Sequence, residues 1–272
     1  FQVDPPEVYY GLMFPRFLAN LAADGVWKPI NNKVHIVREQ SAYNQTIAST
    51  LEKALKGTKL QLAHITDVIS PVQDWGPVQE DLKQSGAGVI MIDHWVAAEE
   101  AAFCQAFVAN PVKGALVYLQ YGPSQSEFLN LAGKAAEGFV WSTVLGVYDD
   151  KQGAEFRKKY QAMYPGVMGL CYNGSAYDTI HFLKNAWTAV EPEDLKGVAD
   201  YVRTHVYRGV DGAINMNNVY QAGLQYPLQT TDLNQGMATL YFQVQNGQHK
   251  IIQPDALAEE KFRLAPWMDG QA

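Results

Sequence analysis

The sequence predicts an α/β fold in which helices cover both faces of a mainly parallel sheet. Short apolar strands alternate with amphipathic helices between residues 33 and 145, and parallel neighbours need such a helix as a crossover. The 272 residues exceed the usual size of one domain, which is about 150 residues, so we expect two compact units. Hydrophobic residues make up 47% of the chain, enough for a packed core.

The first repeat is a strand at 34–37 followed by a helix over 43–56, whose apolar residues recur at the spacing of one helix face. The same reading continues along the chain. We expect strands at 59–65, 89–92, 115–119 and 139–145, and helices at 75–84, 97–109 and 124–131. Asp74 is the expected N-cap of the helix at 75–84. Because crossovers are right-handed, these repeats predict a complete doubly wound lobe.

The pattern changes after residue 150. Three helices are expected at 151–163, 175–190 and 192–206, with no strand between them. The middle helix has an apolar stripe that needs a cover, formed by Ala176, Ile180, Leu183 and Trp187. We expect irregular chain over 207–237. A hairpin then follows, with strands at 239–244 and 250–252 and a type I′ turn at Asn246–Gly247.

Composition excludes several classes of partner. The net charge is −7 and no long basic run occurs, so neither nucleic acid nor an anionic membrane surface is expected as a partner. No apolar run approaches the roughly 18 residues of a membrane span. Cys104 and Cys171 have no further cysteine or histidine at zinc-ligand spacing, so we expect no metal site.

The motifs of the common cofactor-binding enzymes are absent from the sequence. The turn after the first predicted strand, residues 38–42, lacks the glycines that let a dinucleotide pyrophosphate approach a helix. No Gly-Lys-Ser/Thr phosphate loop and no Gly-x-Ser-x-Gly nucleophile motif occurs. We therefore expect no cofactor and no catalysis, although an enzyme with an unrecognised site stays open as an alternative.

Several sequence stretches occur in the order and spacing of one known family. They are Phe1-Gln2-Val3-Asp4-Pro5-Pro6, residues 33–43, Asp74-Trp75, residues 116–124 leading to Leu131-Ala132-Gly133, Ser175-Ala176-Tyr177-Asp178 at a helix start, residues 207–212, and residues 240–247. In these stretches the chain resembles the solute-binding proteins of ABC transporters of the branched-chain amino acid (Leu/Ile/Val) type.

The resemblance implies the two-lobed type I periplasmic-binding-protein fold, with one complete doubly wound lobe and the C-terminal part of the other. Residues 1–32 would be the first crossing segment and a helix, and 33–147 the complete lobe 2. Residues 148–238 would be the returning helices of lobe 1, and 239–272 the last crossing strand, the hairpin and a tail. On this reading the N-terminal part of lobe 1, with most of its sheet, is lacking. The stripe at Ala176 to Trp187 is then expected to be uncovered.

Aromatic residues follow three of the predicted strands. In an open parallel sheet the ligand crevice lies beyond the carboxyl ends of the strands, which places Tyr43, Trp95, Gln120 and Tyr121 at one edge. Rings there can stack on a small molecule while phenol and amide groups orient it. The alternative is that these rings are ordinary core residues.

The resemblance assigns ligand contacts to Tyr43, Trp95, Tyr121 and Gly122 in lobe 2, and to Tyr172 on the lobe 1 side. Amino acid binders of the family carry an acidic residue where this chain has Tyr121, and a phenol supplies no negative charge at neutral pH. We therefore expect a ligand without an essential ammonium group: an aromatic or branched carboxylate, or an amide. Two roles stay open for Asp93: an acid that replaces the missing one in holding an ammonium group, or a cap or turn residue.

The function implied by the resemblance is extracytoplasmic, periplasmic binding of a small solute in the cleft between two lobes, for delivery to an ABC permease. The lobes would close around the ligand, because contacts to both favour the closed state. No metal, nucleic acid or membrane-spanning segment is expected. The alternatives are a cytoplasmic ligand-sensing domain of the same fold and a small-molecule enzyme.

Overall fold

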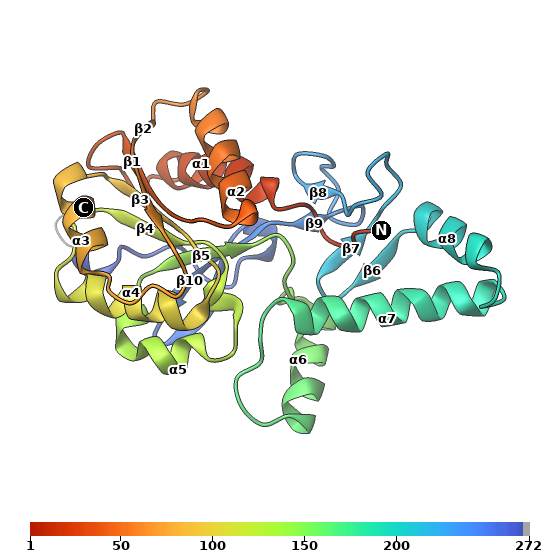
Figure 1. Cartoon of the computed structure of the whole chain (residues 1–272). Coiled ribbons are helices and arrows are strands. Elements are labelled where there is room, and N and C mark those ends of the chain that lie inside the picture. Colours follow the sequence, from red (N-terminus) through yellow and green to blue (C-terminus); the bar gives the residue numbers. More distant parts are fainter. Residues whose placement is uncertain (269–272) are drawn as a thin grey trace. The chain divides into compact units, whose positions relative to one another are not determined.

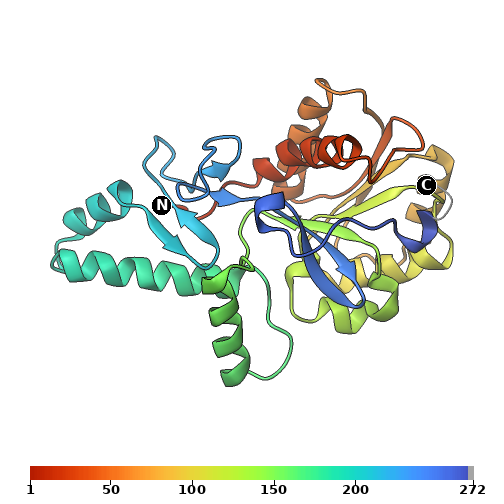
Figure 2. The same cartoon turned by 180° about the vertical axis from the view of Figure 1, so that it is seen from behind.

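The computed structural model describes residues 1–268 (Figures 1 and 2). The chain forms two compact units. Unit 1 comprises Phe1–Pro6 and Val144–Leu240, and unit 2 comprises Glu7–Thr143 together with the chain from Tyr241. The chain therefore passes between the units three times, and each unit is built from segments that are far apart in the sequence.

Unit 2 is organised around a seven-stranded sheet with the order β11-β10-β5-β4-β3-β1-β2. The strands are β1 (Lys33–Glu39), β2 (Gln61–Val68), β3 (Val89–Asp93), β4 (Leu116–Leu119), β5 (Val140–Thr143), β10 (Leu240–Gln245) and β11 (Gln248–Gln253). Strands β1 to β5 pair in parallel, and β10 pairs with β11 antiparallel. The predicted α/β fold with a mostly parallel sheet is confirmed.

Helices lie on both faces of this sheet, with α1 and α2 on one face and α4 and α5 on the other (Figure 1). They are α1 (Val8–Ala23), α2 (Ala42–Leu55), α3 (Gly76–Ser85), α4 (Ala97–Ala109) and α5 (Phe128–Ala132). Helices α1 and α2 approach closely at Gly11, where a Cβ atom would lie 2.5 Å from the Ile47 carbonyl oxygen. Glycine is therefore required at this crossing.

The core of unit 2 is rich in stacked aromatic rings. Phe17 of α1 stacks on Tyr241 of β10 with ring centroids 4.1 Å apart, and Trp141 of β5 stacks on Phe242 at 4.2 Å. All four side chains are at most 1% exposed. Full burial of such a ring stabilises the fold by about 1.5–3 kcal/mol. Strand β10 is therefore a core strand of unit 2.

The hairpin formed by β10 and β11 has the predicted turn. Asn246 and Gly247 have φ angles of 53° and 70°, and a type I′ turn requires positive φ at both central residues. Strand β10 lies beside β5, so the hairpin extends the same sheet as the parallel strands.

Two expectations for helices in unit 2 are wrong. Instead of one helix over 124–131, the structure has a 3₁₀ turn at Gly122–Ser124 (η1) and then the five-residue α5. Gln125 interrupts the helix because its backbone is extended and its side-chain amide donates to the Trp95 carbonyl. The N-cap of α3 is Trp75; the Asp74 carboxylate instead accepts from the Gly76 N–H.

Unit 1 contains three helices and four short strands. They are α6 (Lys151–Met163), α7 (Tyr172–Ala189), α8 (Leu195–Thr204), β6 (Tyr207–Gly209), β7 (Gly212–Ile214), β8 (Gln225–Tyr226) and β9 (Met237–Ala238). The expectation of irregular chain over 207–237 is wrong, because β6–β7 and β8–β9 form two small sheets. Helix α7 also begins at Tyr172, ahead of the expected start at Ser175.

One side of α7 packs on the core of unit 1, where Phe182 and Ala186 meet Ile214 and Met237. The predicted stripe lies largely at the surface: Ile180 is 61% and Trp187 46% exposed, Ala176 is exposed, and only Leu183 packs against the core. Across residues 1–268, no helix has both the length and the hydropathy that crossing a membrane requires.

Candidate functional site

The carboxyl ends of β4, β3 and β1 are neighbours in the sheet of unit 2, so the loops that follow them share one edge. We call this edge the rim and define it as residues 40–43, 94–96 and 120–125. It contains five of the six predicted ligand-binding residues: Tyr43, Trp95, Gln120, Tyr121 and Gly122. The rim lies where open parallel sheets bind ligands.

Tyr43 and Gln120 are brought together at the rim. Tyr43 lies in the first turn of α2, whose N-cap Ser41 accepts from the Asn44 N–H at 3.3 Å. The Gln120 side-chain amide donates to the Tyr43 hydroxyl oxygen at 2.8 Å. Burial raises the pKa of Tyr43 well above its ordinary value, against the opposing effect of the Gln120 hydrogen bond, so the phenol is neutral at physiological pH. This bond joins the end of β4 to the start of α2.

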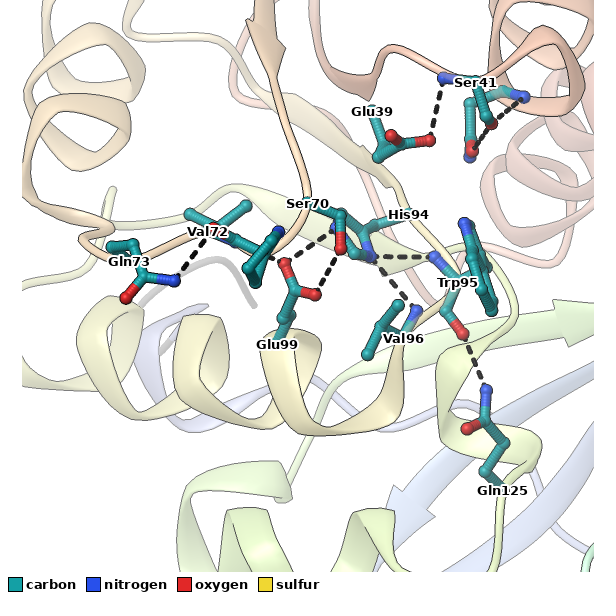
Figure 3. A network of polar contacts seen from close by, with 12 residues as sticks. Glu39, Ser41, Ser70, Val72, Gln73, His94, Trp95, Val96, Glu99 and Gln125 are labelled. Carbon is teal, nitrogen blue, oxygen red and sulfur yellow. Dashed lines mark hydrogen bonds and ion pairs between the residues drawn. The ribbon is translucent and has the colours of Figure 1, made fainter.

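Trp95 presents the most exposed ring at the rim. Its side chain is 46% exposed, whereas its main chain is bound on both sides. The Trp95 N–H donates to Nδ1 of His94 at 2.9 Å, and the Trp95 carbonyl accepts from the Gln125 amide at 2.6 Å (Figure 3). The indole is thus a solvent-exposed apolar group on a fixed backbone, as a stacking contact requires.

Tyr121 and Gly122 follow Gln120 directly. The Tyr121 side chain is only 8% exposed. A Cβ atom at Gly122 would lie 2.1 Å from Oε2 of Glu100, so any larger residue would have to displace this buried carboxyl, and the packing of η1 on α4 favours glycine. The predicted ligand contacts of both residues stay predictions.

The comparisons with known proteins concern the whole chain. The sequence matches no protein-family model and no curated protein. Among solved structures, a protein of Silicibacter pomeroyi described as a branched-chain amino acid ABC transporter is 29% identical and superposes with a TM-score of 0.90. The match covers 98% of this chain and 70% of that protein. In sequence and in fold, nearly the whole chain is therefore similar to a solute-binding protein of the branched-chain amino acid ABC transporter type.

More distant solved structures share the fold. A leucine binding protein of Thermotoga maritima is 17% identical, with a TM-score of 0.69 over 94% of this chain and 68% of that one. A solute binding protein of Rhodopseudomonas palustris in complex with benzoate is 12% identical, with a TM-score of 0.72 over 97% of this chain and 67% of its own. Both relatives are described as binding proteins, and the predicted type I periplasmic binding fold is confirmed.

Two carboxyl groups lie beneath the rim of unit 2. Asp93, at the end of β3, is fully buried and accepts from the Asn44 side-chain amide at 2.7 Å. Glu100 is also fully buried, in the first turn of α4. Burial raises the pKa of both carboxyls well above their ordinary values. Asp93 is therefore a buried partner of α2, and its side chain offers no exposed negative charge to a ligand.

Glu100 was not predicted from the sequence, although a signal for it exists. It shares the spacing of one helix face with Phe103, Cys104 and Phe107, which are all fully buried. An acidic residue on an apolar helix face is a candidate for a buried carboxyl. Cys104 lies on the same buried face, as a small apolar residue would.

His94 and Glu99 form a network behind Trp95 (Figure 3). Nε2 of His94 lies 3.3 Å from Oε2 of Glu99. The same Glu99 carboxylate accepts from the Ser70 hydroxyl and from the Val72 N–H, both at 2.6 Å. Burial lowers the pKa of His94, although Glu99 and Glu39 oppose this effect, so the imidazole is neutral at pH 7.

Tyr172 is the first residue of α7 in unit 1 and is 66% exposed. Whether it contacts a ligand held at the rim stays a prediction. Within the described residues 1–268, no three histidine, cysteine, aspartate or glutamate side chains are grouped as a metal site would require.

Proposed function

We propose that this solute-binding protein holds a small solute at the rim of unit 2, outside the cytoplasm, and delivers it unchanged to an ABC permease. The single observation that carries the proposal is Trp95, a half-exposed indole on a fixed main chain beside the Tyr43–Gln120 pair. Its support comes from the solved relatives, which include ABC transporter proteins and an extracellular ligand-binding receptor. We propose Tyr43, Trp95, Gln120, Tyr121, Gly122 and Tyr172 as ligand contacts.

The proposed ligand is a branched or aromatic carboxylate, or an amide, without an essential ammonium group. A rim that holds an ammonium needs an exposed negative charge. Asp93 and Glu100 are buried and their pKa values are raised, so both favour the neutral form. Tyr121 supplies a phenol in place of a carboxylate. The indole and phenol groups favour apolar or flat ligands.

The ligand class is tested with a matched pair of compounds in a thermal-shift screen. Leucine and its 2-oxo acid share the branched side chain and the carboxylate, but the second has a ketone where leucine has its ammonium group. Benzoate and 4-methylpentanamide, an amide without an amine, complete the set. A ligand that binds only the native state raises the melting temperature as its concentration rises. We expect the 2-oxo acid, benzoate or the amide to stabilise the protein more than leucine does. Stabilisation by leucine alone would contradict the proposed ligand class.

Delivery without catalysis has its own test. Mass spectrometry of a compound that stabilises the protein, after prolonged incubation and release by denaturation, is expected to return the compound unchanged. Accumulation of a product with time would contradict the proposal and favour an enzyme.

A further inference from the structure

The N–H side of the Trp95 main chain is held by one side chain. Nδ1 of the preceding residue, His94, accepts from the Trp95 N–H at 2.9 Å and from the Val96 N–H at 3.1 Å. His94 itself is fully buried, whereas the Trp95 ring is 46% exposed. The histidine therefore has no access to a ligand at the surface, and its visible effect is on the backbone that carries the ring.

This arrangement requires one protonation state of the imidazole. Nδ1 accepts a hydrogen bond only when it carries no proton, so the proton of the neutral ring is on Nε2. Nε2 lies 3.3 Å from Oε2 of Glu99, a contact without hydrogen-bond geometry, and the negative charge of this carboxylate favours a proton on the nearer ring nitrogen. The two N–H groups that donate to Nδ1 define the tautomer, and the carboxylate beside Nε2 favours it.

Groups from several elements face His94. The charged ones are Glu99 of α4 and Glu39 at the end of β1. The ring of Trp75, at the start of α3, lies edge-on with its centroid 6.3 Å from that of His94. Both carboxylates favour protonation, and burial opposes it more strongly.

The contacts of Glu99 extend the network to a third loop. Glu99 binds the Ser70 hydroxyl and the Val72 N–H in the loop after β2, and the Trp95 carbonyl binds Gln125 in the loop after β4. The loops after β2, β3 and β4 are thus tied together through the 94–96 turn (Figure 3).

We propose that His94 is a positioning residue for Trp95. Its neutral imidazole fixes the 94–96 turn, which holds the indole at the rim before a ligand binds. Glu99 favours the tautomer that this requires. The proposal deepens the proposed function, on which its ligand-binding part rests. Fixing a contact residue before binding improves affinity because less conformational freedom is lost on binding. Protonation removes the acceptor at Nδ1, so acid is expected to release the turn.

Asparagine at position 94 is the conservative comparator. The side-chain oxygen of asparagine accepts from the N–H two residues on, as Nδ1 of His94 accepts from Val96, and it does not titrate. An alanine side chain at position 94 has no hydrogen-bond acceptor for these N–H groups. His35→Asn is the matched control, because His35 is another fully buried histidine, bonded to Ser85 and Thr66 within the body of unit 2.

The first measurement needs no ligand. Amide hydrogen exchange by NMR gives protection factors for the Trp95 and Val96 N–H groups from pH 7.5 to 5.0. We expect wild-type protection to fall as the pH decreases below about 6.5, the ordinary histidine value. In His94→Ala we expect protection at least about tenfold lower than in wild type at pH 7.5, since each broken hydrogen bond costs about 1.4 kcal/mol, a factor of 10, and we expect the difference to shrink as the pH falls.

His94→Asn is expected to retain protection of the Val96 N–H with no dependence on pH, and His35→Asn to behave as wild type. Wild-type protection in the His94→Ala variant would overturn the proposal. So would a wild-type pH profile in His94→Asn, because the titration would then belong to another group.

The second measurement addresses the ligand, with the 2-oxo acid of leucine, benzoate and leucine as probes in calorimetric titrations. We expect His94→Ala to weaken binding about tenfold, Trp95→Ala to weaken it at least as much, and the double variant to bind no more weakly than Trp95→Ala. Additive losses would contradict a positioning role. If no probe binds wild-type protein, the proposed ligand class fails, while the exchange measurement still decides the role of His94.

Discussion

At position 122, packing alone favours glycine, although Gly122 is also a candidate ligand contact. Its Cα faces the buried carboxyl of Glu100, and the nearest backbone atom to an added Cβ would be the Ala97 nitrogen at 3.3 Å. The Glu100 side chain is fully buried and has little room to yield. The sequence could not separate this packing role from ligand contact, because both require glycine.

Gly122→Ala is therefore expected to lower the free energy of unfolding by about 1–3 kcal/mol through overpacking. Urea denaturation measures this value. Gly57→Ala is the control, because a Cβ there would meet only the Ala54 carbonyl at 3.8 Å, and its effect should stay within about 0.5 kcal/mol. A cost for Gly122→Ala that persists undiminished in a Glu100→Ala background would show that the two residues do not clash.

At the scale of elements, α1 is held to the sheet by aromatic packing. Phe17 stacks on Tyr241 at 4.1 Å, and Phe14 lies 4.5 Å from the ring of Tyr118, measured between ring centroids. Helix α1 and strand β10 thus bind together two segments that are more than 200 residues apart in the sequence.

Phe17→Ala is expected to cost about 3–5 kcal/mol of unfolding free energy, because it removes a buried ring and leaves a cavity against Tyr241. Arg16→Ala, at an exposed position of the same helix, should change it by less than about 0.5 kcal/mol. Equal effects of the two substitutions in denaturant titrations would mean that α1 is not part of the core.

The elements of unit 2 were predictable because each has a strong local signal. The apolar spacing of α4 gives its bounds, and Asn246–Gly247 gives the hairpin turn. The strands within 207–238 have two or three residues each, which is too short for alternation to be visible. That β10 joins β5 in the sheet was also not predictable, since pairing between distant segments leaves no local pattern.

The same reasoning applies to the site. The strand-end rule placed Tyr43, Trp95 and Gln120 at one edge, and β1, β3 and β4 are neighbours in the sheet. The 2.8 Å hydrogen bond from Gln120 to Tyr43 and the hydrogen bond from the Trp95 N–H to His94 come from loop geometry. A sequence pattern does not contain that geometry.

At the scale of the whole molecule, buried ionisable groups link stability to pH. Burial, with His64 nearby, lowers the pKa of His35 to about 4, so the folded state keeps this imidazole neutral. An unfolded chain protonates it near 6.5. The unfolded state therefore binds more protons between those values, and the contribution of His35 to stability is lost as the pH falls from about 6.5 towards 4. The raised pKa values of Asp93 and Glu100 act in the opposite sense.

A comparison of variants isolates the histidine. His35→Asn should be less stable than wild type at pH 7.5, and the difference should shrink with decreasing pH by at most about 1.4 kcal/mol per pH unit, the value for one proton. Urea midpoints at pH 7.5, 6.0 and 5.0 measure this difference. A difference that stays constant over this range would mean that His35 does not titrate there.

Ligand binding at the rim of unit 2 is tested most directly by a pair of tryptophan substitutions. Trp95 at the rim and Trp187 on α7 of unit 1 are both 46% exposed, so Trp95→Ala and Trp187→Ala remove equal rings from equally exposed positions. In calorimetric titrations with the best ligand of the screen, we predict at least a tenfold weaker affinity for Trp95→Ala and wild-type affinity for Trp187→Ala. Wild-type affinity in Trp95→Ala would contradict ligand binding at the rim.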